Sequence, residues 1–151
     1  MKQGAVAEGA FGFKLAASGS ELFLGGTNTD LYTGDIEYHE VSSAVGFWVI
    51  GSGSVSVGGK EVSAGSGEMQ TIIDTGSTLI TAPPDAAQEF WNSVPGSQPF
   101  AEEEGLYTFP CDSVPEVAFS WGGQSWPLSA DRSVIPLVGV QRRQVLMQLV
   151  A

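Results

Sequence analysis

Residues 70–80 read Gln70-Thr71-Ile72-Ile73-Asp74-Thr75-Gly76-Ser77-Thr78-Leu79-Ile80, and this stretch decides the fold prediction. An apolar run leads into an Asp-Thr-Gly-Ser turn, and a second apolar pair follows at once. An ordinary Asx turn explains such a pattern, because Asp can accept a hydrogen bond from its own backbone two residues on. A carboxylate held between buried apolar strands would also be rigid and partly desolvated, as a catalytic acid requires. On that second interpretation Asp74 lies at the tip of the turn, and the residues expected to be largely buried are Ile72, Ile73, Leu79 and Ile80.

The rest of the chain reads as short strands separated by glycine, of which there are 20 in 151 residues. One run of β-forming residues ends at Gly25-Gly26, and the pairs at 58–59 and 122–123 each stand between two such runs. Those two pairs predict hairpins, because the tight primed turns need positive φ. One helix is expected after Pro83-Pro84-Asp85, ending before Pro95-Gly96, with an apolar face made by Ala87, Phe90, Trp91 and Val94. We therefore predict an all-β fold class, mainly strands with one or two short helices.

Composition excludes several function classes. The chain has 17 acidic and 6 basic side chains and a formal net charge of −11, which disfavours binding to nucleic acid or to an anionic membrane surface. No apolar run approaches the roughly 20 residues of a membrane helix. The stretch from Met1 to Glu8 lacks the apolar core of a signal peptide. With one cysteine, Cys111, and one histidine, His39, we expect no internal disulfide, no metal site and no cofactor.

Other catalytic signatures are missing from the sequence. It contains no Gly-x-Ser-x-Gly elbow, no phosphate-binding loop and no dinucleotide fingerprint. His39 has no evident nucleophile and acid to work with, so we interpret it as a strand or loop histidine. Three tryptophans leave one alternative open, a carbohydrate-binding β module that stacks sugars on Trp48, Trp121 or Trp126. At strand spacing, tryptophans more often pack in the core or on the sheet surface.

Around the Asp-Thr-Gly-Ser turn, the chain resembles the pepsin-like aspartic proteases, and in particular the C-terminal lobe of a fungal member. Residues 73–79 resemble the second of the family's two catalytic motifs. The other matching segments follow in the family's order and include residues 11–15, 19–26, 32–36, 47–48, 57–59 and 107–128. The resemblance implies a pepsin-like lobe, one half of a fold that normally has two lobes.

The resemblance also implies roles for the residues of the turn. Asp74 would be one of two facing carboxylates that share a proton and activate a water against the scissile carbonyl. Thr75 would reach the backbone of the opposite lobe, and the Ser77 hydroxyl would bond to the catalytic carboxylate. Gly76 and Thr78 would contact the extended substrate. The implied function is an aspartic-type endopeptidase that acts in acid.

The sequence carries a single Asp-Thr-Gly, so the implied partners are a polypeptide substrate and an N-terminal lobe that supplies the second Asp and the flap. The alternative is a catalytically inactive single lobe that still binds peptides or is vestigial. Relatives in the family are secreted or vacuolar, which is the expected localisation here, although no signal peptide is visible in this chain.

The expected domain organisation follows the extent of the resemblance. Residues 1–10 are interpreted as a remnant of the segment between lobes, residues 11–133 as the C-terminal lobe, and residues 134–151 as a divergent tail that looks unrelated to the family. Cys111 is disulfide-bonded in this lobe of the family, and its partner is missing here, so we expect a free thiol.

Overall fold

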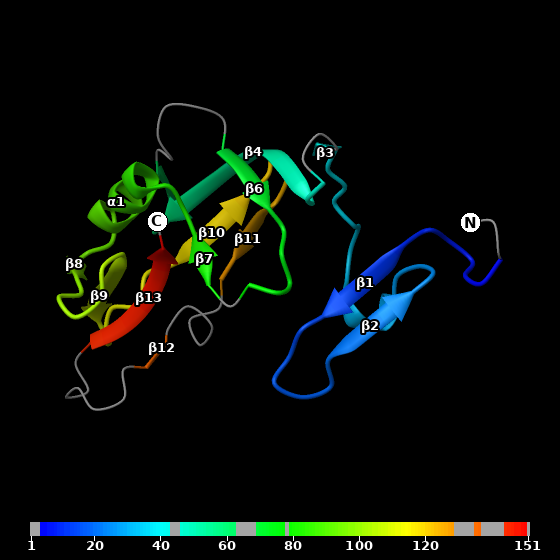
Figure 1. Ribbon diagram of the computed structural model, residues 1–151, viewed down its shortest axis with the longest axis horizontal. Coiled ribbons are helices and arrows are strands. Elements are labelled where there is room, and N and C mark those ends of the chain that lie inside the picture. Colours follow the sequence, from blue (N-terminus) through cyan, green and yellow to red (C-terminus); the bar gives the residue numbers. More distant parts are fainter. Residues whose placement is uncertain are drawn as a thin grey trace. The chain divides into compact units, whose positions relative to one another are not determined.

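The computed structural model describes residues 4–42, 46–62, 69–77, 79–128, 135–136 and 144–150, the last two ranges as backbone only. The chain divides into two compact units, Met1–Ile36 and Glu37–Ala151 (Figure 1). The boundaries expected after residues 10 and 133 stay predictions.

The first unit is a two-stranded antiparallel ribbon followed by a short 3-10 helix. Strand β1 (Phe11–Lys14) pairs with β2 (Glu21–Leu24), and the helix η1 (Thr29–Leu31) begins where the Asn28 side chain accepts a hydrogen bond from the Asp30 N–H. The predicted end of a strand run at Gly25-Gly26 is confirmed, since β2 ends at Leu24. Gly25 takes positive φ just beyond it, and its N–H donates to the Ala10 carbonyl.

The second unit contains a sheet built around one long strand, β4 (Val49–Val57). Its hairpin to β5 (Lys60–Val62) has positive φ at Gly58 and Gly59. Gly122 takes positive φ between β10 (Val117–Ser120) and β11 (Ser125–Pro127), so both hairpin predictions from Gly-Gly pairs are confirmed here. The other strands of this sheet are β3 (Val41–Ser42), β5 (Lys60–Val62), β6 (Met69–Ile72), β10 (Val117–Ser120) and β11 (Ser125–Pro127).

A further sheet of the same unit brings together segments that are far apart in the sequence. Its path is β12 (Ile135–Pro136), β13 (Gln144–Val150), β9 (Leu106–Pro110) and β8 (Gln98–Pro99). Strand β7 (Ile80–Thr81) pairs with β13 in parallel (Figure 1). Leu149 and Val150 of the expected tail thus pair with the strand that follows the Asp-Thr-Gly-Ser turn.

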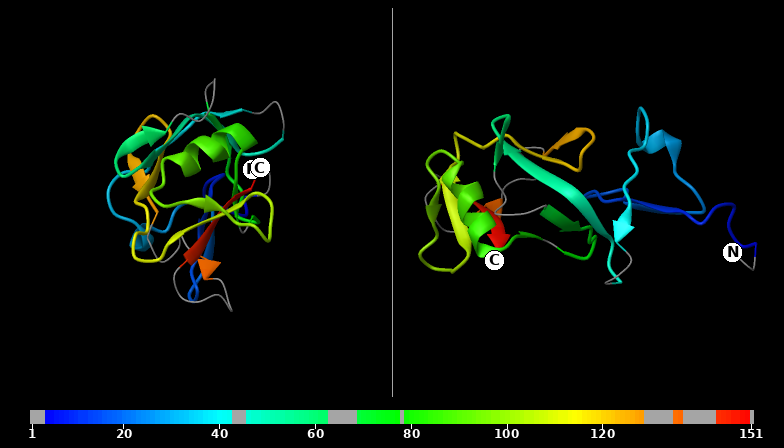
Figure 2. Two further views of the ribbon diagram at one scale, coloured as in Figure 1. Left: turned by 90° about the vertical axis from the view of Figure 1, so that its left-hand side faces the viewer. Right: turned by 90° about the horizontal axis from the view of Figure 1, so that it is seen from above.

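The predicted helix is confirmed as α1 (Pro84–Asn92), which lies next to β9 and β13 (Figure 2). Pro84 occupies the first turn, where its missing N–H costs no helix hydrogen bond, and Gly96 takes positive φ just beyond the end. Trp91 is fully buried and stacks on Tyr107 with ring centroids 4.9 Å apart. The residues of the surrounding core are Val55, Val57, Val62, Ala87, Phe90, Val94, Phe109 and Val117.

The all-β fold class is confirmed, since the described residues form many short strands with one α-helix and one 3-10 helix. Cys111 is half-buried and carries a free thiol in this chain. No helix in the described part of the chain is both long and apolar enough to cross a bilayer.

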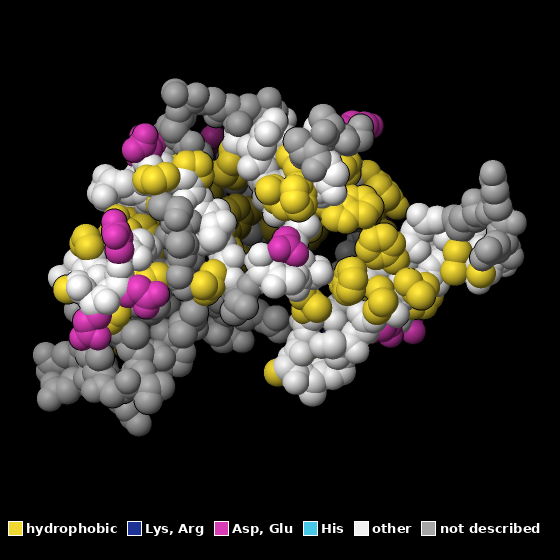
Figure 3. Space-filling model, in the orientation of Figure 1, with side chains coloured by type: hydrophobic (Ala, Val, Ile, Leu, Met, Phe, Trp, Pro, Cys, Tyr) yellow, Lys and Arg dark blue, Asp and Glu magenta, His cyan; other side chains and the backbone are white. Residues whose placement is uncertain are grey.

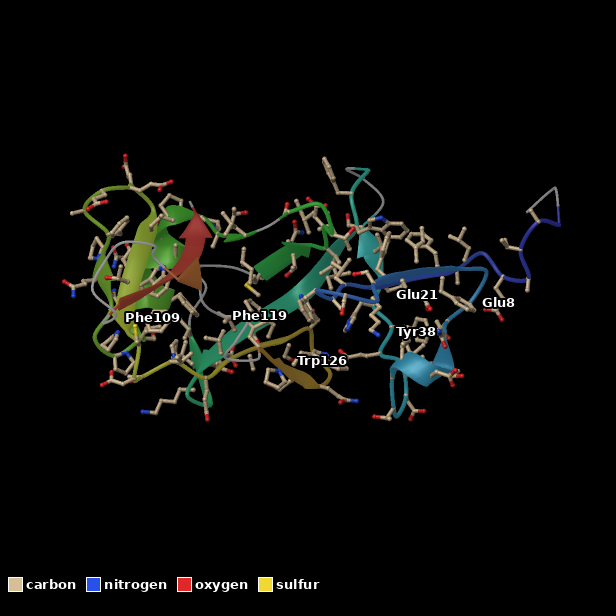
Figure 4. All side chains as sticks on the ribbon, turned by 90° about the horizontal axis from the view of Figure 1, so that it is seen from below. Glu8, Glu21, Tyr38, Phe109, Phe119 and Trp126 are labelled. Atoms are coloured by element: carbon tan, nitrogen blue, oxygen red, sulfur yellow. The ribbon has the colours of Figure 1, made fainter. Side chains whose placement is uncertain are left out.

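Phe109 on β9, labelled in Figure 4, is fully buried and tests this account of the core. We expect Phe109→Ala to lower the free energy of unfolding by about 3–5 kcal/mol, because the lost ring leaves a cavity that close-packed neighbours cannot fill. Chemical denaturation measures the effect. Phe47→Ala is the matched control, because Phe47 is 62% exposed and its loss should cost under about 0.5 kcal/mol. Equal effects of the two substitutions would contradict the placement of the core.

Candidate active site

Asp74 stands two residues beyond the end of β6. That strand pairs with β4, with Ile72 opposite Val49, and the Ile73 N–H extends the ladder by donating to the Trp48 carbonyl at 2.9 Å. The chain then leaves the sheet of β4 at Asp74 and enters the other sheet at β7, which pairs with β13. The backbone of Asp74 is therefore anchored on its N-terminal side by β4.

Both oxygens of the Asp74 carboxylate accept hydrogen bonds from the turn. The Gly76 N–H donates to Oδ1 at 2.8 Å, and the Ser77 hydroxyl donates to Oδ2 at 2.6 Å. Gly76 is suited to this place by space rather than by φ, because a Cβ there would lie 3.2 Å from Asp74 Oδ1. The arrangement is an Asx turn with an added serine donor, and it fixes the plane of the carboxylate.

The same hydrogen bonds set the protonation state. Donation by the Ser77 hydroxyl, and next by the Gly76 N–H, holds the pKa of Asp74 below its ordinary value, since both bonds favour the charged form. Burial contributes little, because Asp74 is exposed. The turn thus presents a carboxylate that stays ionised further into acid than a free Asp.

The expectation of buried flanking residues is wrong. Ile72 is 56% exposed and Ile73 and Ile80 are each 44% exposed, while Leu79 is half-buried. Asp74 is not desolvated either. The physical reason is that burial depends on what covers a strand, and no described residue covers this side of β6 and β7. The sequence pattern shows that these residues are apolar, but it does not show whether other residues pack over them.

The predicted site residues fall as follows. Thr75, Gly76 and Ser77 are exposed and share the turn with Asp74, whereas Thr78 lies outside the described residues. Their catalytic and substrate-binding roles stay predictions. Among the residues that the structure describes, no three or more His, Cys, Asp or Glu side chains gather where a metal ion could bind.

Exposed apolar side chains adjoin the turn. Phe47 and Trp48 precede β4 and are exposed, and Trp48 is linked to Ile73 through the backbone. Figure 3 shows apolar side chains beside β6 on this face. We call Phe47, Trp48, Ile72, Ile73 and Ile80 the apolar rim of the site.

One contact near the site was missed from the sequence. The Trp121 indole N–H donates to the Thr71 hydroxyl at 2.9 Å, which ties β6 to the end of β10. The two residues are 50 positions apart in the sequence. The one sequence signal for this contact is a tryptophan at the end of an alternating run. His39, interpreted as a loop histidine, lies 2.7 Å from Glu37 beside the same tryptophan.

Comparison with known proteins gives the chain a clear set of relatives. A family model described as eukaryotic aspartyl protease matches residues 1–144. An aspartic protease of Phaffia rhodozyma is 40% identical over 137 residues, which cover 86% of this chain and 33% of that protein. Pepsin A of Sus scrofa is 31% identical over 136 residues (88% and 35%), and secreted aspartyl protease 1 of Malassezia globosa is 34% identical over 134 residues (87% and 31%). The chain spans about a third of the length of these relatives.

Because two donors bind the Asp74 carboxylate, removing one of them should change the pKa of Asp74. Ser77→Ala removes the larger cause of the lowered pKa, so the pKa of Asp74 should rise towards its ordinary value. Because the folded-state pKa is depressed, the stabilisation from this bond is present above the unfolded pKa and is lost as pH falls through the folded pKa. Carbon-detected NMR of the Asp74 carboxyl measures the shift. Ser113→Ala, at an exposed serine, should leave the titration unchanged, and the same titration in both variants would contradict the assigned cause.

Proposed function

The chain belongs to the eukaryotic aspartyl protease family, and on that premise we propose that it is the C-terminal lobe of an aspartic-type endopeptidase with Asp74 as one of two catalytic carboxylates. One observation carries the proposal. The carboxylate of Asp74 is exposed at the end of a strand, and both its oxygens are fixed by donors of its own turn. A base that must meet a water and a substrate needs both exposure and a fixed orientation.

The proposed chemistry uses the ionised state that the turn favours. Asp74 accepts a proton from a water molecule while the water oxygen attacks the scissile carbonyl carbon. A second carboxylate, which stays protonated, donates a hydrogen bond to the carbonyl oxygen. Two carboxylates close together cannot both ionise at low cost, so one acts as base and the other as acid. The proton held by Asp74 then passes to the amide nitrogen as the C–N bond breaks, which releases the amine and leaves a carboxyl group on the other product.

The second carboxylate would come from an N-terminal lobe. Two findings support this partner: the chain spans about a third of its relatives, and the apolar rim of the site is exposed. Exposed apolar surface next to a polar turn marks a face that another surface covers. An N-terminal lobe and an extended polypeptide substrate would together cover the rim, with Thr75 reaching the opposite lobe and Gly76 and Thr78 contacting the peptide backbone.

A second candidate is a peptide-binding lobe without catalysis. It is favoured by the presence of one Asp-Thr-Gly in the chain, because one carboxylate cannot be base and acid at once. Of the three tryptophans of the carbohydrate-binding alternative, Trp121 stacks on Phe119 and its N–H is bonded to Thr71, whereas Trp48 and Trp126 are exposed. We propose a secreted or vacuolar location, which is supported by the relative named as secreted in Malassezia globosa.

The proposal is tested by supplying an N-terminal lobe. The chain is combined with the N-terminal lobe of the Phaffia rhodozyma relative and assayed with an extended peptide. We expect cleavage in acid that disappears towards neutral pH, because raising the pH removes the proton that the two carboxylates share. Asp74→Asn should reduce turnover by at least about a thousandfold while keeping the fold.

Asp85→Asn provides the matched control, since Asp85 is an exposed aspartate in the first turn of α1. It should leave turnover unchanged. Full activity of Asp74→Asn would refute the assignment. For the chain alone we expect no turnover. Binding of a statine-type peptide by the assembled lobes, without any cleavage, would favour the peptide-binding candidate instead.

A further inference from the structure

Trp121 reaches across the central strand of its sheet to β6, the strand that leads to Asp74. Ser120 pairs with Ser54 on β4, so the next residue, Trp121, lies beside Gly53. Gly53 in turn pairs with Met69 on β6. The Trp121 indole N–H donates to the Thr71 hydroxyl at 2.9 Å, so the bond joins β10 to β6 over the backbone of β4.

Gly53 leaves the space that this bond requires. A Cβ at position 53 would lie 3.0 Å from the Thr71 hydroxyl oxygen and 3.0 Å from the Met69 carbonyl oxygen. The register between β4 and β6 also shifts at this point, between Ile50 and Gly53, and Ser52 takes a φ of 56° there. In the described residues, β6 pairs with no strand other than β4. Because β6 is hydrogen-bonded along one edge and lies next to a bulge, a side-chain hydrogen bond on its face restricts its position further.

Trp121 is itself held in place. Its ring stacks on Phe119, with centroids 6.3 Å apart and planes at 15°, and His39 meets its ring edge-on. Phe119 and Trp126, both labelled in Figure 4, pair across the two strands of this hairpin.

The tip of the hairpin is fixed by a carboxylate. Glu37 Oε2 accepts a hydrogen bond from the Gln124 N–H at 2.8 Å, and a Cβ at Gly123 would overlap the same carboxylate. Glu37 Oε1 is buried and lies 2.7 Å from His39 Nε2, so this oxygen is satisfied when that nitrogen carries the proton. Glu37 and His39 thus fix the loop that begins with Trp121.

We propose that Trp121 is a positioning residue for Asp74, acting through Thr71. Thr71 precedes Asp74 by three residues, and the intervening Ile73 N–H is bonded to Trp48. Holding Thr71 prevents β6 from shifting at the bulge, so the chain leaves the sheet with the Asp74 side chain directed to Gly76 and Ser77. The importance of this position for catalysis rests on the proposed function, but the positioning itself does not.

The test uses the 151-residue chain and NMR, without any protease assay. Trp121→Phe removes the indole donor, and Thr71→Val removes the hydroxyl acceptor at nearly constant shape. In both variants we expect the pKa of Asp74 to rise towards its ordinary value and amide exchange at Ile73 to accelerate by roughly three- to tenfold, the effect of one lost hydrogen bond. Thr71→Ser keeps the hydroxyl and should retain the original titration.

Two further variants make the test specific. Trp126→Phe is the same chemical change on the same hairpin, at a ring that is 44% exposed, and it should leave the Asp74 titration and Ile73 exchange unchanged. The double variant Trp121→Phe/Thr71→Val should shift them no further than either single variant, because both remove the same bond.

A purely structural role gives a different result. If Trp121→Phe and Thr71→Val lower the melting temperature but leave the Asp74 titration as in the original chain, Trp121 does not position Asp74 and the proposal is wrong. This outcome is distinct from failure of the proposed function, which would appear as an active Asp74→Asn enzyme with the NMR results unaltered.

Discussion

The second unit depends on backbone hydrogen bonding by one long strand, β4, to strands on both of its edges. This strand is nine residues long and carries β10 and β3 along one edge and β5 and β6 along the other. Val55 and Val57 turn into the core against α1, while the opposite end of the strand aligns β6. Side chains alternate between the faces of a strand, so the one-residue shift next to Gly53 decides which face each residue of β6 occupies.

The position of Asp74 shows how a carboxylate can be tuned without burial. Burial raises the pKa of an acid by penalising its charge, whereas hydrogen bonds to the charged form lower it. This turn uses hydrogen bonds and remains in water. On the proposed function, the neighbouring lobe would bring the opposing influence, a second negative charge, so that the two carboxylates divide one proton. In the chain alone, the hydrogen bonds of the turn dominate, and they lower the pKa of Asp74.

Sequence reasoning succeeded where the determinants are local. The ends of α1 follow from Pro84 and Gly96, and the hairpin between β4 and β5 follows from two adjacent glycines with positive φ. It failed where burial or pairing depends on segments that are distant in the sequence or are not part of this chain. The pattern of Ile72 and Ile73 describes a strand but not its cover, which is why they were expected to be buried. The bond from Trp121 to Thr71 and the pairing of β7 with β13 depend on which segments meet in space, and no local pattern encodes that choice.

The parallel pair of β7 and β13 has a consequence for how the lobe folds. It joins Ile80 to Leu149, roughly 70 residues apart, whereas the hairpin of β4 and β5 closes over two residues. Closing a long loop costs chain entropy before any stabilising contact has formed, so pairings between residues far apart in the sequence form slowly. The segment that leads out of the Asp74 turn would therefore gain its neighbour late, after the β4 sheet is in place. Among the described residues β7 has no strand partner other than β13, so we expect the segment after the Asp74 turn to be among the last parts of this unit to become ordered.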